Sequence, residues 1–147
     1  MKIGCTTPFY LCIEINSKAI RMKHFDQFKN KVFRIAEQRP SGFTFNPWLN
    51  SFPVKGYVVA SYQTQDCFGK FGLFKVMKFV AKHMDYCIGG WRNENGDFQF
   101  DASKVYMNIE EAVEVALANN QRAIFNLYTG KEIMSCDYGR YTRLLAA

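Results

Sequence analysis

Two alternating apolar runs that flank an Asn-Gly pair constrain the fold more than any other feature of this chain. The runs are "YCIGGW" at 86–91 and "DFQFDASKVY" at 97–106, with Asn95-Gly96 between them. Period-two alternation predicts half-buried strands, and Asn-Gly favours a tight hairpin because both residues tolerate positive φ. The chain therefore contains an antiparallel sheet built around this hairpin.

The segments on either side of the hairpin extend this sheet. Residues 56–63 are a predicted strand, 68–84 a helix with Asp66 as N-cap, 109–119 a second helix and 121–128 a last strand. Asn108 and Glu111 form a capping-box pattern at the second helix. The order β-α-β-β-α-β predicts a ferredoxin-like α+β fold, with an antiparallel sheet covered by two helices on one face.

The first 55 residues predict an N-terminal β-α-β extension. It consists of a strand at 9–15, a helix at 24–38 that Arg39-Pro40 ends, a short strand at 42–45, and a loop at 46–55 around Trp48. We expect one domain over residues 1–147, with a core at 56–128 and a loosely held tail at 135–147. The length of 147 residues suits a single hydrophobic core.

Composition narrows the class of protein. Hydrophobic residues make up 48% and charged residues 22%, as in globular proteins. No apolar run approaches a membrane helix, and Pro8 and Glu14 interrupt the only run that resembles a signal peptide. The five cysteines include no C-x-x-C, and the only two histidines, His24 and His83, lie near no pair of cysteines, so we expect neither zinc nor disulfides. These features favour a cytoplasmic protein without metal or cofactor.

Charge is distributed unevenly along the chain. Residues 1–84 hold thirteen Lys or Arg against four Asp or Glu, a net of +9. Residues 85–147 hold six against nine, a net of −3. This asymmetry indicates an anionic partner for the first part of the chain.

The predicted helix at 68–84 carries a basic ridge opposite its apolar stripe. The ridge residues follow each other at i, i+4, i+7 and i+11, and they are Phe71, Lys75, Lys78 and Lys82. Lys31 and Arg34 on the preceding helix add positive charge. We expect a non-enzymatic protein that binds nucleic acid through this basic helical face, where each lysine that meets a phosphate adds salt-sensitive affinity.

The alternation rule also assigns the two faces of strand 97–106. Phe98 and Phe100 share one face, and Gln99 and Asp101 share the other. Burying a carboxylate without a partner is costly, so the phenylalanines are predicted to face the core. The open face of the sheet would then carry carboxylates that repel phosphate, which argues against bases stacking on this sheet.

Two alternative functions remain open. One is a protein-interaction or inhibitor module that uses the open sheet face or the aromatic loop around Trp48 and Phe52. The other is a small-nucleotide site at Gly89, Gly90 and Trp91, although the glycine pair lacks phosphate-loop spacing and also fits close backbone packing.

An enzyme is not expected, because no acid, base and nucleophile come together in the sequence. Cys67 is the one candidate nucleophile, near a helix start and Lys70. His83 lies sixteen residues further along the same helix, about 24 Å away. The two side chains cannot form a catalytic pair.

Three segments carry a resemblance to other proteins, and they are "GYVVASYQTQDCFGKFGL", "IGGWRNENGDFQFDASKVY" and "EEAVEVALANNQRAIFNLYTGKEI". Over about residues 42–133 the chain resembles small accessory proteins of bacterial mobile elements and phages. The resemblance implies a protein that contacts nucleic acid or interferes with host machinery. It carries over no catalytic or binding residue.

Overall fold

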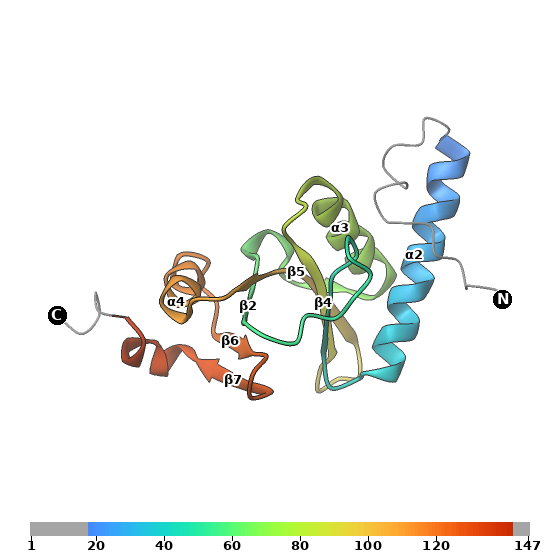
Figure 1. Cartoon of the computed structure of the whole chain (residues 1–147). Coiled ribbons are helices and arrows are strands. Elements are labelled where there is room, and N and C mark those ends of the chain that lie inside the picture. Colours follow the sequence, from blue (N-terminus) through green and yellow to red (C-terminus); the bar gives the residue numbers. More distant parts are fainter. Residues whose placement is uncertain (1–17, 143–147) are drawn as a thin grey trace.

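The computed structural model describes residues 18–142, which form an α+β structure with one seven-stranded antiparallel sheet (Figure 1). The helices of this part are α2 (Lys18–Gln38), α3 (Gly69–Lys82) and α4 (Ile109–Ala118), with 3₁₀ turns η1 (Tyr62–Thr64) and η2 (Ser135–Arg140). The strands are β1 (Phe43–Phe45), β2 (Tyr57–Ala60), β3 (Cys67–Phe68), β4 (Cys87–Arg92), β5 (Phe98–Tyr106), β6 (Ala123–Asn126) and β7 (Lys131–Met134).

The predicted α+β class with an antiparallel sheet is confirmed. The sheet runs β1-β4-β5-β2-β6-β7 with β3 also on β5, so it has three strands beyond the four of the ferredoxin-like core that we expected at 56–128. The sheet is larger because β1 adds beyond β4, β7 adds beyond β6, and the short β3 takes part of one edge of β5. The predicted strand at 9–15 lies outside the described residues.

Strand β5 lies in the middle of the sheet and connects its two halves. One of its edges pairs with β4, and its other edge pairs first with β3 and then with β2. Between β3 and β2 on this edge, the backbone of Ala102 forms hydrogen bonds with the segment that connects β2 to β3. Its carbonyl accepts from the Ser61 amide at 2.8 Å, and its amide donates to Thr64 Oγ1 at 2.9 Å. The ladder along β5 is therefore continuous although its partner changes.

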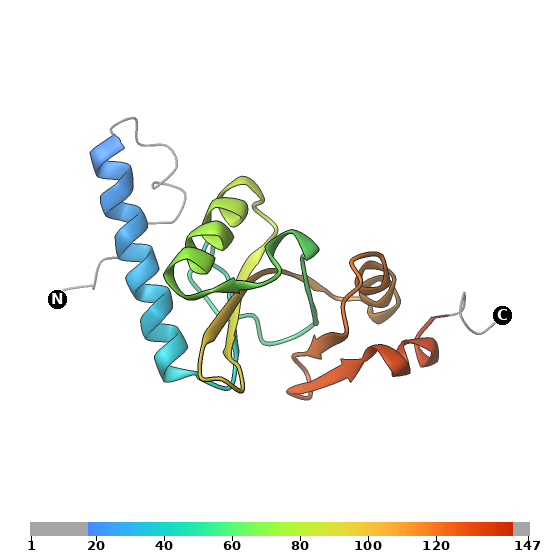
Figure 2. The same ribbon diagram turned by 180° about the vertical axis from the view of Figure 1, so that it is seen from behind.

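All three described α-helices lie on one face of the sheet and build two hydrophobic clusters there (Figure 2). The first cluster packs α2 and α3 on β1, β4 and the first half of β5, around Phe100 and Ala102. The second packs α4 and η2 on β2, β6 and the end of β5, around Val59 and Tyr106. The prediction that Phe98 and Phe100 face the core is confirmed, since Phe100 is fully buried and Phe98 packs against the first cluster.

The hairpin between β4 and β5 turns at the predicted place with a different geometry. Asn93 organises the loop, because its Oδ1 accepts from the amides of Asn95 and Asp97 at 3.0 Å. Only Gly96 has a positive φ, +82°, so this is not the two-residue Asn-Gly turn that we expected. The turn is longer than two residues, and its Gly96 needs the backbone freedom of glycine.

Both ends of α3 differ from the prediction, and α2 begins at Lys18 instead of residue 24. Asp66 has a left-handed φ of +57° and does not cap α3, whose N-cap is Phe68 without a side-chain bond. Met84 lies beyond the end of α3 and is exposed. By contrast, the predicted cap of α4 is confirmed, since Asn108 Oδ1 accepts from the amides of Glu110 and Glu111.

The prediction of a loosely held tail from residue 135 is wrong for residues 135–142. Tyr138 in η2 is only 1% exposed and belongs to the second hydrophobic cluster. Its hydroxyl donates to the carbonyl of Gln121 at 3.1 Å. This segment is therefore part of the packed structure. The sequence prediction missed it because a single buried aromatic residue produces no periodic apolar pattern.

Replacing Thr64 with Val tests the bond that bridges the two partners of β5. The change keeps the side-chain shape but leaves the buried Ala102 amide without an acceptor, so we expect the free energy of unfolding to fall by about 1–3 kcal/mol. Urea denaturation measures this. Thr64→Ser, which retains the hydroxyl, is the matched control, and equal losses in both variants would assign the effect to packing alone.

Candidate nucleic-acid interface

The predicted basic ridge is formed by the outer side of α3. The inner side of this helix buries Leu73, Val76, Met77 and Val80 in the first hydrophobic cluster. The turn of the helix then points the residues at i, i+4, i+7 and i+11 away from the sheet, and all of the ridge residues Phe71, Lys75, Lys78 and Lys82 are exposed. The structure thus brings these residues together on one strip of surface.

The charge of this strip is uncompensated within the described part of the chain. Helix α3 contains four lysines and no acidic residue. The ion pairs among the described residues lie elsewhere, at Lys29–Asp26, Lys104–Asp85 and Arg140–Asp137. A run of lysines without acidic partners produces a local positive potential that attracts polyanions.

Two phenylalanines accompany the lysines. Phe71 is 87% exposed, and Phe74, one turn along, is 47% exposed. The Lys78 ammonium lies 5.6 Å from the centre of the Phe74 ring, and Phe25 of α2 contacts the same ring at 6.1 Å between centroids. Phe74 is therefore in contact with both Phe25 and Lys78, whereas Phe71 presents its ring to solvent.

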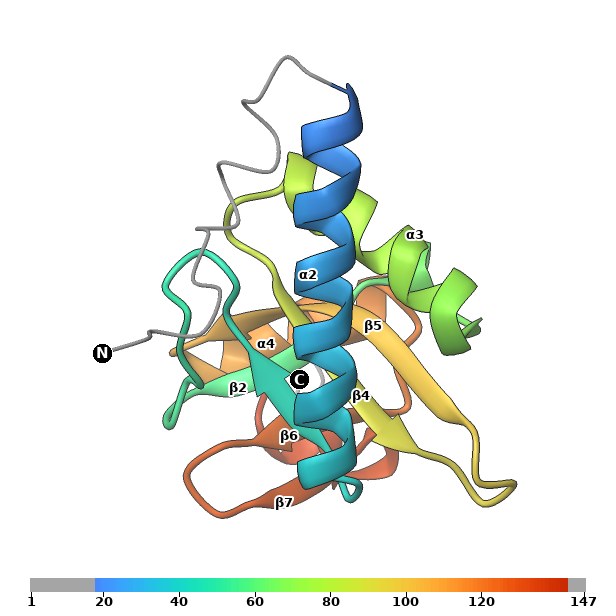
Figure 3. The same cartoon turned by 90° about the vertical axis from the view of Figure 1, so that its right-hand side faces the viewer.

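We expected Lys31 and Arg34 of α2 to add to the ridge on α3. The structure places these two side chains on sides of α2 that do not join the ridge. Lys31 donates to Asn50 Oδ1 and lies 5.3 Å from the Phe45 ring centre, on the side of α2 that meets the 46–56 loop. Helix α3 lies on the opposite side of α2 (Figure 3). Arg34 is exposed on the outer surface of α2, where it lines a shallow hollow of about 390 Å³ with Gln27, Asn30 and Phe33.

Gly89 and Gly90 have packing neighbours that explain them, one on each face of the sheet. A Cβ at Gly89 would lie 2.5 Å from Asp101 Oδ1 and 2.9 Å from Ser103 Oγ. A Cβ at Gly90 would lie 2.8 Å from Phe43 Cε1 and 3.0 Å from Phe100 Cδ1. The first glycine makes room for a polar pair, and the second makes room for two core rings.

The prediction of an acidic open face is wrong at Asp101, the carboxyl group that lies beside Gly89. Asp101 is buried, and its Oδ1 accepts a hydrogen bond from the Ser103 hydroxyl. Burial raises the pKa of the Asp101 carboxyl, and the Ser103 bond opposes that rise. The sequence argument missed this arrangement because it depends on a missing side chain in the neighbouring strand.

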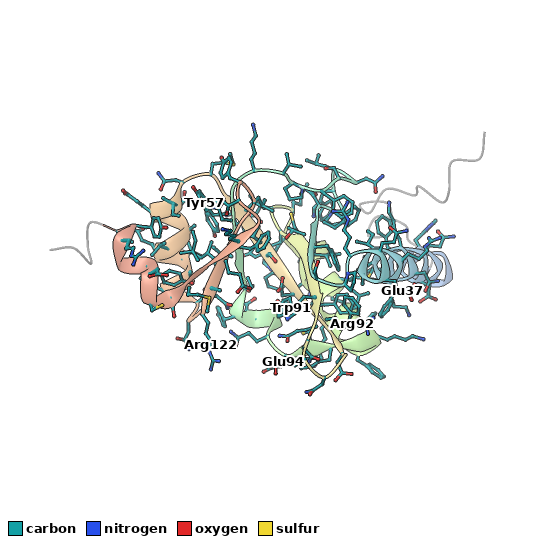
Figure 4. All side chains as sticks on the ribbon, turned by 90° about the horizontal axis from the view of Figure 1, so that it is seen from below. Glu37, Tyr57, Trp91, Arg92, Glu94 and Arg122 are labelled. Carbon is teal, nitrogen blue, oxygen red and sulfur yellow. The ribbon has the colours of Figure 1, made fainter. Side chains whose placement is uncertain are left out.

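The helix-free face of the sheet shows aromatic residues at one end. The strand register aligns Trp91, Gln99 and Phe68 in a row across β4, β5 and β3. Trp91 is 37% exposed, and Figure 4 shows it near the middle of the molecule when viewed from below. This end of the open face is thus aromatic and amide in character, not acidic.

The predicted loop at 46–55 does not present the aromatic surface that we expected. Phe52 packs on the Phe45 ring at 5.3 Å, and the Arg39 guanidinium covers it at 3.8 Å. Trp48 is half-buried against the first hydrophobic cluster. The exposed apolar residues of this loop are Leu49 and Val54.

The candidate nucleophile Cys67 lacks the surroundings that activate a thiol. Its side chain is buried in β3, and burial raises the pKa of the thiol, with Lys75 opposing this effect. Burial likewise raises the pKa of Cys87 to about 11. His83 instead stacks on Phe79, with ring centroids 4.2 Å apart. A reactive cysteine needs an environment that favours the thiolate.

Within residues 18–142, no three His, Cys, Asp or Glu side chains gather in a way that could hold a metal ion. None of the helices described has both the length and the apolar character needed to cross a bilayer.

Replacing Asp101 with Asn tests its buried carboxyl. The folded state favours the neutral form of the Asp101 carboxyl. The contribution of this group to the free energy of unfolding is therefore fully present below the ordinary pKa of 3.8 and is lost as pH rises through the higher folded-state pKa. The Asn variant stays neutral and keeps the acceptor for Ser103. We expect it to be more stable than the parent at neutral pH and to lose this advantage near about pH 4.

Urea denaturation at both pH values measures the difference, and Asp97→Asn at the exposed hairpin is the control. A loss of stability in Asp101→Asn at neutral pH would contradict the prediction, since it would show that the ionised carboxylate is needed.

Comparisons with protein-family models, with curated proteins and with solved structures find no match for this chain.

Proposed function

We propose that this protein binds nucleic acid through the exposed side of α3. The observation that carries the proposal is a helix with four lysines, no acidic residue and a nearly fully exposed phenylalanine. The lysines would contact phosphates, and each contact would release counterions and so add salt-dependent affinity. Lys75, Lys78 and Lys82 are the central residues, and Phe71 lies beside them.

Two considerations favour a polyanion over a merely solvated surface. A lysine strip that serves solubility alone gains nothing from an apolar ring, since exposing Phe71 to water is unfavourable. Lys75, Lys78 and Lys82 also make no ion pair with the described acidic residues, so binding does not first have to break such bonds. The resemblance to accessory proteins of mobile elements and phages is consistent with this function and stays a prediction.

A second candidate function is a protein-interaction module. The observation that favours it is the exposed aromatic row on the helix-free face, where Trp91 and Phe68 flank Gln99. Exposed aromatic residues of this kind are enriched in protein interfaces. Self-association is its simplest form, and sedimentation of the parent and of the Trp91→Ala, Phe68→Ala double variant would detect it.

Reversing the ridge charges tests the leading proposal. The variant Lys75→Glu, Lys78→Glu, Lys82→Glu removes three phosphate contacts, so the slope of log affinity against log salt is expected to fall by about 2 to 3. Fluorescence anisotropy with labelled oligonucleotides over a range of salt concentrations measures this slope.

The matched control reverses three exposed charges elsewhere, with Lys55→Glu, Arg122→Glu and Lys131→Glu. Both triple variants change the net charge equally, by two charges per substitution. Retention of the slope in the control and its loss in the ridge variant would assign the binding to α3. Equal slopes in all three proteins would overturn the proposal.

A further inference from the structure

We infer that the nucleic acid bound by α3 is single-stranded, with a base stacked on Phe71 and the neighbouring phosphates held by Lys75, Lys78 and Lys82. This inference rests on the proposed function and specifies its ligand. It follows from the aromatic residues of the ridge and from the position of α3 beside α2, since the lysines alone would suit any polyanion.

The exposed rings favour unpaired bases. In a duplex the base faces are stacked inside the helix, so a surface phenylalanine meets the backbone or the base edges and not a base face. In a single strand each base offers a face to an aromatic ring, and stacking of this kind contributes to affinity regardless of sequence. Phe71, at 87% exposure, has a free ring face for such a contact.

The surroundings of Phe71 extend the stacking surface. Phe74 is half exposed next to it and is held in place by Phe25 and by the Lys78 ammonium. A rigid second ring supports an adjacent base or sugar without a large loss of side-chain freedom. The ridge from Phe71 to Lys82 is about 16 Å long, so it offers the rings at one end and cations along the rest.

The position of α2 argues against insertion of α3 into a duplex groove. The major groove is about 12 Å wide, which a single helix with its side chains fills. Helix α2 packs beside α3 through Phe25 and Phe74, and Figure 3 shows the two helices crossing at the same surface. With α2 on one flank, α3 could enter a groove only by its outer side, whereas a single strand can lie along the whole ridge.

The test compares a labelled single-stranded oligonucleotide with the duplex formed from it and its complement. We expect tighter binding of the single strand, and Phe71→Leu to lower that affinity about 5- to 150-fold while the affinity for the duplex stays within about twofold. Phe71→Leu keeps an apolar residue and the helix but removes the aromatic face. Phe71→Trp restores the face, so it is expected to retain the affinity of the parent.

Phe71→Trp also gives a readout that does not depend on affinity. Stacking of a base on the new indole quenches its emission, measured after subtraction of the signal of the parent, which contains Trp48 and Trp91. Quenching by the single strand and not by the duplex is the expected result.

The outcomes separate the two proposals. If the lysine triple variant loses binding but Phe71→Leu binds both probes like the parent, the lysines contact phosphate and the single-strand inference is overturned. Equal loss on both probes would show that Phe71 acts in another way and would also overturn it. If the parent binds neither probe at low salt, the proposed function fails as well.

Discussion

The amide and carbonyl of Ala102 are both bonded by the segment that links β2 to β3, through Thr64 and Ser61. This is where β5 changes partner, and an unbonded peptide group at this buried position would be costly. The rest of the sheet depends on the connection, because β5 pairs with β4 on one edge and with two strands in turn on the other. The two hydrophobic clusters meet along the same strand.

The two sides of α3 differ in character. The inner residues of α3 complete the first hydrophobic cluster, so the helix is fixed on the sheet along its whole length. Its outer residues are free of ion pairs with the described acidic residues, so they are available to a ligand. Helix α2 and the 46–56 loop hold Lys31 elsewhere, which confines the ridge to α3.

Sequence patterns predicted most elements because local signals agreed with the fold. The spacing of Leu73, Val76 and Val80 defined α3, and Asn108 defined the start of α4. The errors occurred where a residue depends on a partner far away in the sequence. Asp101 looked like a surface carboxylate because neither the gap at Gly89 nor its burial in the sheet is visible in the spacing of β5. Tyr138 looked like part of a tail because its contacts are with Gln121 and the second cluster.

The lysine ridge has an energetic consequence for the helix that carries it. Lys75, Lys78 and Lys82 follow each other at i+3 and i+4 spacing, where like charges repel and weaken a helix by a few tenths of a kcal/mol per pair. In an isolated peptide, α3 would therefore be a poor helix, and its order in the protein comes from the residues that it buries. An anion on the ridge relieves the repulsion, so α3 becomes more stable when its charge is neutralised. The lysine ridge is thus a part of the fold where like charges oppose the helix that carries them.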